Sequence, residues 1–150
     1  MHDIYSVAGS IAEHSNWTLS NLSLQKLTYL AQMMHIGETD QPMFAEDFEA
    51  WDYGPVVPKL YHNLKMFGAD PVERYSSLTC MKSPTADQKR IIADVTDFGV
   101  QKKPGELVSI THWKNGAWAK VYAKNIKGLT IPKQLIRAEY LERLRDSADA

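Results

Sequence analysis

The chain of 150 residues is poor in the features that mark secreted, membrane or disulfide-stapled proteins. Its single cysteine, Cys80, cannot form an internal disulfide, which favours a reducing compartment such as the cytoplasm. No apolar run approaches the roughly 20 residues that a membrane-spanning helix needs, and residues 1–20 do not resemble a signal peptide. We therefore expect a cytoplasmic protein with no membrane partner.

An excess of charge of one sign is also missing. The formal net charge is −1, whereas dedicated nucleic-acid binders normally carry a basic patch or stripe. The most basic predicted helix, residues 133–145, also contains Glu139 and Glu142, which weakens the case for a DNA recognition helix. We expect no direct nucleic-acid partner.

Motifs for catalysis and metal binding are absent as well. The five histidines are scattered, with no His-x-x-x-His spacing, and Cys80 has no second cysteine to share a metal. Neither a Gly-x-Ser-x-Gly elbow nor a Walker-type phosphate loop occurs. We expect no metal, no cofactor and no catalytic residues.

What the chain does contain is the composition of a single globular domain spanning residues 1–150. Its 44% apolar and 23% charged residues are typical of a folded rather than a disordered chain. Apolar residues recur at helical spacing through most of it, which predicts a mainly α fold of about six or seven helices. At most one short β-ribbon is expected, near residues 43–53, where that spacing fades. The last residues, 147–150, are expected to fray.

Local signals set several expected helix boundaries. Asp3 is placed to cap a first helix, and Thr85 with Gln88 has the spacing of a capping box for another. A central helix that is apolar nearly all round should run from about residue 20 or 23 to 36, with Gly37 just beyond its end. The remaining helices are predicted at 56–67, 106–112, 115–124 and from Pro132 onward, the last with Leu135, Ile136, Tyr140, Leu141 and Leu144 facing inward.

The most informative stretch is residues 47–58, where an acidic and aromatic segment meets Gly54-Pro55. Gly54 can take a positive φ without steric cost, and Pro55 and Pro58 suit a first helical turn because they lack an N–H. The stretch therefore predicts an extended arm, a sharp corner and a helix from about residue 56.

Charged residues near this corner suggest a buried ion pair. Four carboxylates, at positions 46, 47, 49 and 52, lie within seven residues, and Lys26 lies inside the apolar run of the central helix. A lysine in such a place either extends its ammonium group to solvent or meets a carboxylate. We hypothesise that Lys26 pairs with Glu49 or Asp52.

The aromatic side chains divide between core and surface. Tyr61 and Phe67 have helical spacing and are predicted to lie in the core. Trp51 and Tyr53 lie on an irregular segment, where the core and a binding interface are equally good interpretations, since Trp and Tyr are enriched in binding hot spots.

Three blocks of sequence resemble the Panacea domain of the SocA-like antitoxin family. The first is Leu24-Gln25-Lys26-Leu27 followed by Tyr29 and Ala31-Gln32. The second runs from Phe44 through Asp47–Trp51 to Tyr53-Gly54-Pro55-Val56, and the third comprises Leu107, Thr111-His112 and Trp118. In the third block Ala117 stands where the family usually has proline. The blocks extend over most of the chain in the family's order.

The resemblance implies a helical, non-catalytic protein that binds and neutralises a protein toxin, usually encoded beside it. Some members are described as adaptors that deliver the toxin to an ATP-dependent protease, and others are phage-associated. The candidate toxin-binding or motif residues are Lys26, Tyr29, Glu49, Trp51, Tyr53, Gly54, Pro55, His112 and Trp118. The same residues are equally compatible with a scaffold whose partner is chosen by residues 68–84 or the C-terminal helix.

One alternative from another class is left open by the residues. A small hydrolase or transferase could use His112, Glu49 and Asp52, provided that the three side chains converge in one pocket.

Overall fold

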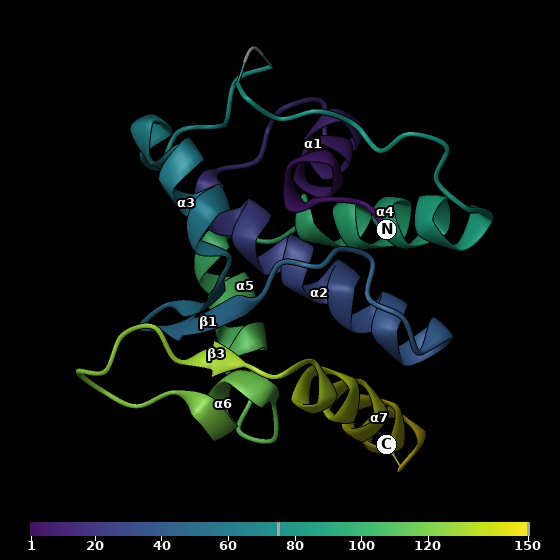
Figure 1. Cartoon of the computed structure of the whole chain (residues 1–150), viewed down its shortest axis with the longest axis vertical. Coiled ribbons are helices and arrows are strands. Elements are labelled where there is room, and N and C mark those ends of the chain that lie inside the picture. The colour runs from purple at the N-terminus through teal and green to yellow at the C-terminus, as the bar shows by residue number, and fades with distance from the viewer. Residues whose placement is uncertain (75, 150) are drawn as a thin grey trace.

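The computed structural model describes residues 1–74 and 76–149, and it confirms a mainly α fold. That part of the chain contains seven α-helices and a small sheet, which lies toward one side of the molecule (Figure 1). The helices are α1 (Ile4–His14), α2 (Asn21–Thr39), α3 (Pro58–Leu64), α4 (Ala86–Gly99), α5 (Pro104–Thr111), α6 (Ala117–Val121) and α7 (Lys133–Asp149). A 3-10 turn, η1 (Lys65–Phe67), extends α3. No described helix is both long enough and apolar enough to cross a membrane.

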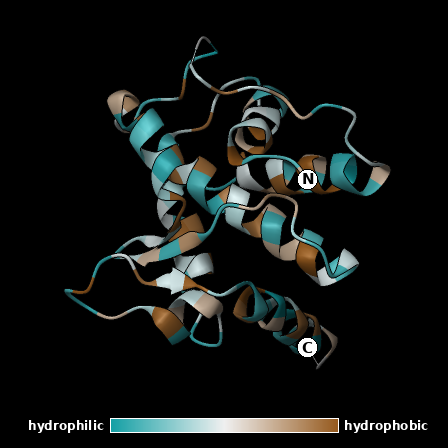
Figure 2. Cartoon of the chain, in the orientation of Figure 1, coloured by the Kyte–Doolittle hydropathy of each residue, from teal (hydrophilic) through white to brown (hydrophobic). Residues whose placement is uncertain are grey.

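Helix α2 lies at the centre of the molecule. It packs against α1 and α4 on one side and against α7 on the other, and α5 also contacts it (Figure 1). Its buried positions occupy almost the whole circumference, as the sequence predicted, and they include polar residues such as Gln25, Lys26 and Gln32. The outer elements are more polar: Figure 2 shows hydrophilic residues over α3 and at the start of α4.

The predicted capping signals form as expected. The Asp3 carboxylate accepts a hydrogen bond from the Ser6 N–H at 2.8 Å, which satisfies an otherwise unpaired donor of the first turn of α1. Thr85 and Gln88 form both bonds of the capping box at the start of α4. These local signals were sufficient to locate two helix starts.

The stretch around Gly54 is a β-hairpin, so the predicted helix start at residue 56 is wrong. Strands β1 (Phe48–Trp51) and β2 (Gly54–Val56) are antiparallel and pair Glu49 with Val56. Gly54 does take a positive φ, 111°, but Pro55 lies in an edge strand, where a missing N–H is tolerated, and the helix begins only at Pro58. A third strand, β3 (Thr130–Ile131), pairs with the other edge of β1 and was not predicted.

Helix α2 continues past Gly37, contrary to the prediction that this glycine lies beyond its end. The helix ends at Thr39, and Asp40 takes the left-handed conformation with φ 61°. Gly37 is required for another reason: a Cβ there would lie 2.1 Å from the ring of Tyr140. The missing side chain therefore lets α7 pack closely on α2.

Two other sequence expectations concern the C-terminal third. Helix α6 is shorter than the predicted range 115–124, and of the five residues predicted to face inward from α7, Leu141 and Leu144 are 37% and 51% exposed. Helix α7 includes residues 147–149, while Ala150, the end of the tail expected to fray, lies outside the described residues. Tyr75, in the connection 68–84, also lies outside them.

Candidate functional site

Polar side chains of α2 hold the backbone of the segment that leads into and out of the hairpin. Gln32 accepts a hydrogen bond from the Met43 N–H at 2.7 Å and donates to the Phe44 carbonyl at 2.8 Å. Gln25 accepts from the Val57 N–H at 3.1 Å. These groups are buried, and a buried donor left without a partner costs about 1–3 kcal/mol, so the glutamines fix where residues 43–57 lie against the central helix.

Lys26 is fully buried and does not form the hypothesised ion pair. Its Nζ donates to the Pro55 carbonyl at 2.9 Å, and neither Glu49 nor Asp52 comes within 4.0 Å of it. Glu49 instead accepts a hydrogen bond from Trp51 Nε1 at 3.0 Å. Burial lowers the pKa of the Lys26 ammonium group from 10.5 to about 7, because the charged form loses its hydration and gains no counter-charge.

Gly54 is required where the hairpin approaches Lys26. A Cβ at Gly54 would lie 2.9 Å from Lys26 Nζ and 2.9 Å from Thr111 Oγ1, and the positive φ would strain any other residue. Blocks one, two and three of the resemblance therefore meet here, with Lys26 from α2, Gly54-Pro55 from β2 and Thr111 from α5. They meet by close packing and through one hydrogen bond.

His112 and Trp118 form an aromatic stack next to this point. Their ring centroids are 3.7 Å apart with an interplanar angle of 4°, and Tyr122 also stacks on Trp118, with centroids 4.5 Å apart. Trp118 Nε1 donates to the Trp51 carbonyl at 2.7 Å, and the Tyr122 hydroxyl donates to Asp52, which raises the pKa of Tyr122. The stack thereby ties α5 and α6 to the hairpin.

The imidazole of His112 is held in a partly buried position. Burial, with a smaller contribution from the positive charge of Lys26, lowers the pKa of His112. Its Nε2 atom is buried and meets no hydrogen-bond partner among the described residues.

Tyr29 leads to a buried carboxylate that the sequence did not single out. Glu139 of α7 accepts from the Tyr29 hydroxyl at 2.7 Å, from the Ala117 N–H at 2.9 Å and from Arg143 at 2.8 Å. Burial, then the charge of Glu139, raises the pKa of Tyr29 well above its usual range. The Glu139–Arg143 spacing was visible in the sequence, but i, i+4 pairs of this kind are usually exposed, so the pattern did not indicate a buried hub.

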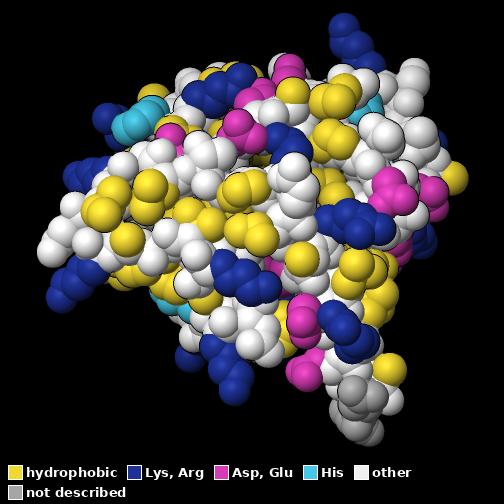
Figure 3. All heavy atoms as spheres, turned by 60° about the horizontal axis from the view of Figure 1, so that its bottom comes forward, with side chains coloured by type: hydrophobic (Ala, Val, Ile, Leu, Met, Phe, Trp, Pro, Cys, Tyr) yellow, Lys and Arg dark blue, Asp and Glu magenta, His cyan; other side chains and the backbone are white. Residues whose placement is uncertain are grey.

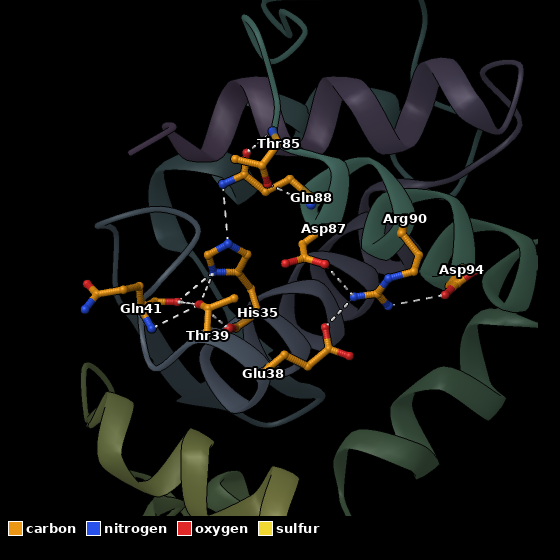
Figure 4. A network of polar contacts seen from close by, with 9 residues as sticks. All are labelled: His35, Glu38, Thr39, Gln41, Thr85, Asp87, Gln88, Arg90 and Asp94. Atoms are coloured by element: carbon orange, nitrogen blue, oxygen red, sulfur yellow. Dashed lines mark hydrogen bonds and ion pairs between the residues drawn. The ribbon is translucent and has the colours of Figure 1, made fainter.

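A second polar network, shown in Figure 4, joins the end of α2 to the start of α4. Gln88 Nε2 donates to His35 Nε2 at 3.3 Å, and His35 Nδ1 lies 2.6 Å from the Gln41 carbonyl. Arg90 contacts Glu38 at 2.7 Å. These groups satisfy one another, so the network is structural.

Three of the candidate residues, Glu49, Trp51 and Tyr53, line a cavity of about 460 Å³ beside the hairpin. Trp51 and Tyr61 line it and meet edge to face with centroids 5.1 Å apart, and Tyr53 lines it while being 70% exposed. Tyr61 and Phe67, both predicted as core, are only partly buried. Glu49 and Asp52 also line this cavity.

The alternative catalytic set is not brought together. His112 does not line the cavity that Glu49 and Asp52 share, and their hydrogen bonds go to Trp51 and Tyr122. Among the described side chains, those of residues 1–74 and 76–148, no three His, Cys, Asp or Glu side chains cluster in a way that could hold a metal ion.

The geometry defines a helical scaffold whose central helix holds a β-hairpin and an adjoining cavity in a fixed position. The family described as "Antitoxin SocA-like, Panacea domain" matches residues 24–119. That range is more than half of the chain and includes all nine candidate residues, and the chain belongs to this family.

A curated relative agrees with this assignment. The chain is 28% identical over 113 residues to a protein named Antitoxin SocA from Caulobacter vibrioides (strain NA1000 / CB15N). The match covers 67% of this chain and 58% of that protein, which is less than two thirds of the relative's length. No solved structure matches the chain.

Proposed function

We propose that this chain is an antitoxin that neutralises a protein toxin by binding it directly, in the cytoplasm, without chemistry of its own. The family match over residues 24–119 is the observation that carries the proposal. The site supports it, because the polar groups of the motif side chains Lys26, Tyr29 and Trp118 are already hydrogen-bonded within the chain. Lys26 and Trp118 donate to main-chain carbonyls, and Tyr29 donates to Glu139. Groups used in this way stabilise a shape and are not free to act on a substrate.

Within this proposal the nine candidate residues have two different roles. Lys26, Tyr29, Gly54, Pro55, His112 and Trp118 form the scaffold. Trp51, Tyr53 and Glu49 line the cavity and are proposed to contact the toxin. A stable interface would bury about 800 Å² on this partner.

Co-expression tests the proposal. Each open reading frame that flanks the gene is expressed with and without this chain, and growth and co-purification are measured. One flanking product should arrest growth, and this chain should restore growth and co-purify with that product. If neither product is toxic, or if toxicity persists with this chain present, the antitoxin proposal fails.

Titration of the purified toxin separates binding from catalysis. A binding antitoxin should reach full inhibition at about one equivalent, whereas a hydrolase or transferase using His112 should act far below it. The His112→Gln variant is a second readout, because loss of inhibition with unchanged binding would support the catalytic alternative.

The mode of neutralisation is a further part of the proposal, and the resemblance implies two forms of it. Inhibition by occupancy should leave the half-life of the toxin in cells unchanged when this chain is present. Delivery to an ATP-dependent protease should shorten that half-life, and deletion of the protease should reverse the effect.

A further inference from the structure

The segment from Leu107 to Ala138 has an unusual charge distribution for a protein of net charge −1. It contains five lysines and one arginine but no aspartate or glutamate. Lys133 and Arg137 pair with Asp47 and Asp40. The others, Lys114, Lys120, Lys124 and Lys127, are exposed and form no ion pair with any described side chain. A local excess of positive charge therefore faces solvent.

This basic segment borders the hairpin cavity. Ile126 and Lys127 line the cavity together with Tyr53, and Lys65, the first residue of η1, lines it as well. Ile126 is 53% exposed, so the cavity opening combines apolar and positively charged groups. Figure 3, turned so that the side with α6 and β3 comes forward, shows apolar side chains gathered on this face with lysine and arginine side chains around them.

We propose that this surface, defined by Tyr53, Lys65, Ile126 and Lys127 and called the basic cavity rim, binds an acidic segment of the toxin. The segment inserts one large apolar side chain into the cavity and places its carboxylates against the lysines. The inference rests on the proposed function and adds to it which face is used and what chemistry the toxin presents.

The negative charge proposed for the toxin segment follows from which charged groups of the cavity already have partners. The two carboxylates in the cavity wall, Glu49 and Asp52, accept hydrogen bonds from Trp51 and Tyr122. The lysines at the rim have no such partner, so they are the groups available to a ligand. Opposite charges across an interface raise the association rate and select partners.

The same wall distinguishes a protein segment from a nucleic acid. A phosphate backbone carries a charge at every nucleotide, and Glu49 and Asp52 would repel it. A polypeptide can place an uncharged side chain beside these two carboxylates and its acidic residues at the rim. Apolar anchors in pockets of this kind supply most of the energy of protein interfaces.

Charge reversal tests the electrostatic half of the proposal. The probe is the purified toxic product of the flanking reading frame, and association rates are measured against salt concentration. The double variant Lys65→Glu/Lys127→Glu should associate about tenfold more slowly at low salt and lose the salt dependence. The control Lys82→Glu/Lys89→Glu, two exposed lysines elsewhere with the same change in charge, should behave as wild type.

Truncation tests the apolar half. Tyr53→Ala and Ile126→Ala should each raise the Kd about tenfold, while Val100→Ala, an exposed apolar residue that does not line this cavity, should leave it unchanged. All three side chains are exposed, so the fold should be retained, and circular dichroism melts check this.

The possible outcomes separate the two proposals. If wild type binds and inhibits the toxin but the rim variants bind it equally well, the role proposed for the basic cavity rim is overturned and the antitoxin proposal stands. If wild type does not bind, both fail. Loss of binding to a 20-nucleotide RNA in the charge variant, with toxin binding retained, would reassign the rim to nucleic acid. A wild-type dimer that the variant dissociates, again with toxin binding retained, would reassign it to self-association.

Discussion

The ammonium group of Lys26 is fully buried with a single hydrogen bond, to the Pro55 carbonyl, and its burial has a cost that depends on pH. Below about pH 7 both the folded and the unfolded chain carry the proton, and above about pH 10.5 neither does. Between these values only the unfolded chain binds it. The free energy of unfolding therefore rises with pH through this window.

Lys26→Met should remove this dependence. For wild type, chemical denaturation at pH 7 to 9.5 should show the free energy of unfolding rising, by at most about 1.4 kcal/mol per pH unit. In Lys26→Met the profile should be flat over the same range. Lys65→Met, which replaces an exposed lysine, is the control and should keep the wild-type slope. A wild-type slope in Lys26→Met would show that another group is responsible.

Glu139 should be the most sensitive carboxylate in the chain. Glu139→Ala leaves Arg143 Nε, the Tyr29 hydroxyl and the Ala117 N–H without their acceptor, and should lower the free energy of unfolding by roughly 3–5 kcal/mol in a urea titration. Glu139→Gln should cost less, since an amide oxygen can still accept.

The matched control for this variant is Glu142→Ala, on the same helix. Glu142 pairs with Arg145 at 3.3 Å on the surface, and its loss should change stability by no more than about 0.5 kcal/mol. Equal effects of the two alanine variants would contradict the role assigned to Glu139.

At the scale of single residues, the sequence predicted where a side chain lies better than it predicted which group that side chain binds. It placed Lys26 correctly in an apolar helix, but it predicted a carboxylate as the hydrogen-bond acceptor. The acceptor is a main-chain carbonyl, and because every residue has one, the sequence gives no signal for it. Glu139 was missed for a related reason: its burial depends on Tyr29, 110 positions away in the chain.

At the scale of elements, the contact between α2 and α7 depends on Gly37. Alanine normally stabilises a helix relative to glycine, yet Gly37→Ala should lower the free energy of unfolding by about 1–3 kcal/mol because the methyl group meets the Tyr140 ring. Thermal unfolding followed by circular dichroism measures this.

Gly105→Ala is the comparison for Gly37→Ala. Gly105 lies in the first turn of α5, and nothing lies within 4 Å of its added Cβ. This variant should be stabilised by up to about 1 kcal/mol, as helix propensity predicts. Stabilisation of both variants would show that α7 can move away without cost.

The elements that the sequence predicted well are those with local signals. Capping residues begin α1 and α4, and apolar spacing identifies α2 over most of its length. The hairpin was misread because Gly-Pro is compatible with both a turn before a helix and an edge strand. Strand β3 could not be predicted, because two residues are too few to show the alternation of polar and apolar side chains typical of a strand. Its pairing partner β1 is also distant in the sequence.

At the scale of the whole molecule, the family match ends at residue 119, but residues beyond 119 also contribute to the packed core. Strand β3 and helix α7 contribute the buried residues Ile131, Ile136 and Glu139. A chain that stops at Gly128 would expose the core around Tyr29 and leave its hydroxyl without a partner.

We therefore predict that the chain ending at Gly128 does not fold cooperatively. Its thermal melt by circular dichroism should lack a sharp transition, whereas a chain ending at Asp146 should melt as wild type does, because the residues it lacks add no buried side chain among those described. A cooperative melt of the shorter chain would show that the matched region is a self-sufficient folding unit.

The hydrogen bonds from Gln25, Lys26 and Gln32 end on main-chain atoms of residues 43–57. Main-chain atoms are common to all amino acids, so these bonds survive when the outward side chains of the hairpin change. Under the proposed function, attachment of the hairpin and recognition of the partner are therefore separable, in the manner of an antibody framework and its variable loops. The proposal then implies that substitutions at the hairpin tip retarget the protein to a different toxin while its architecture is preserved.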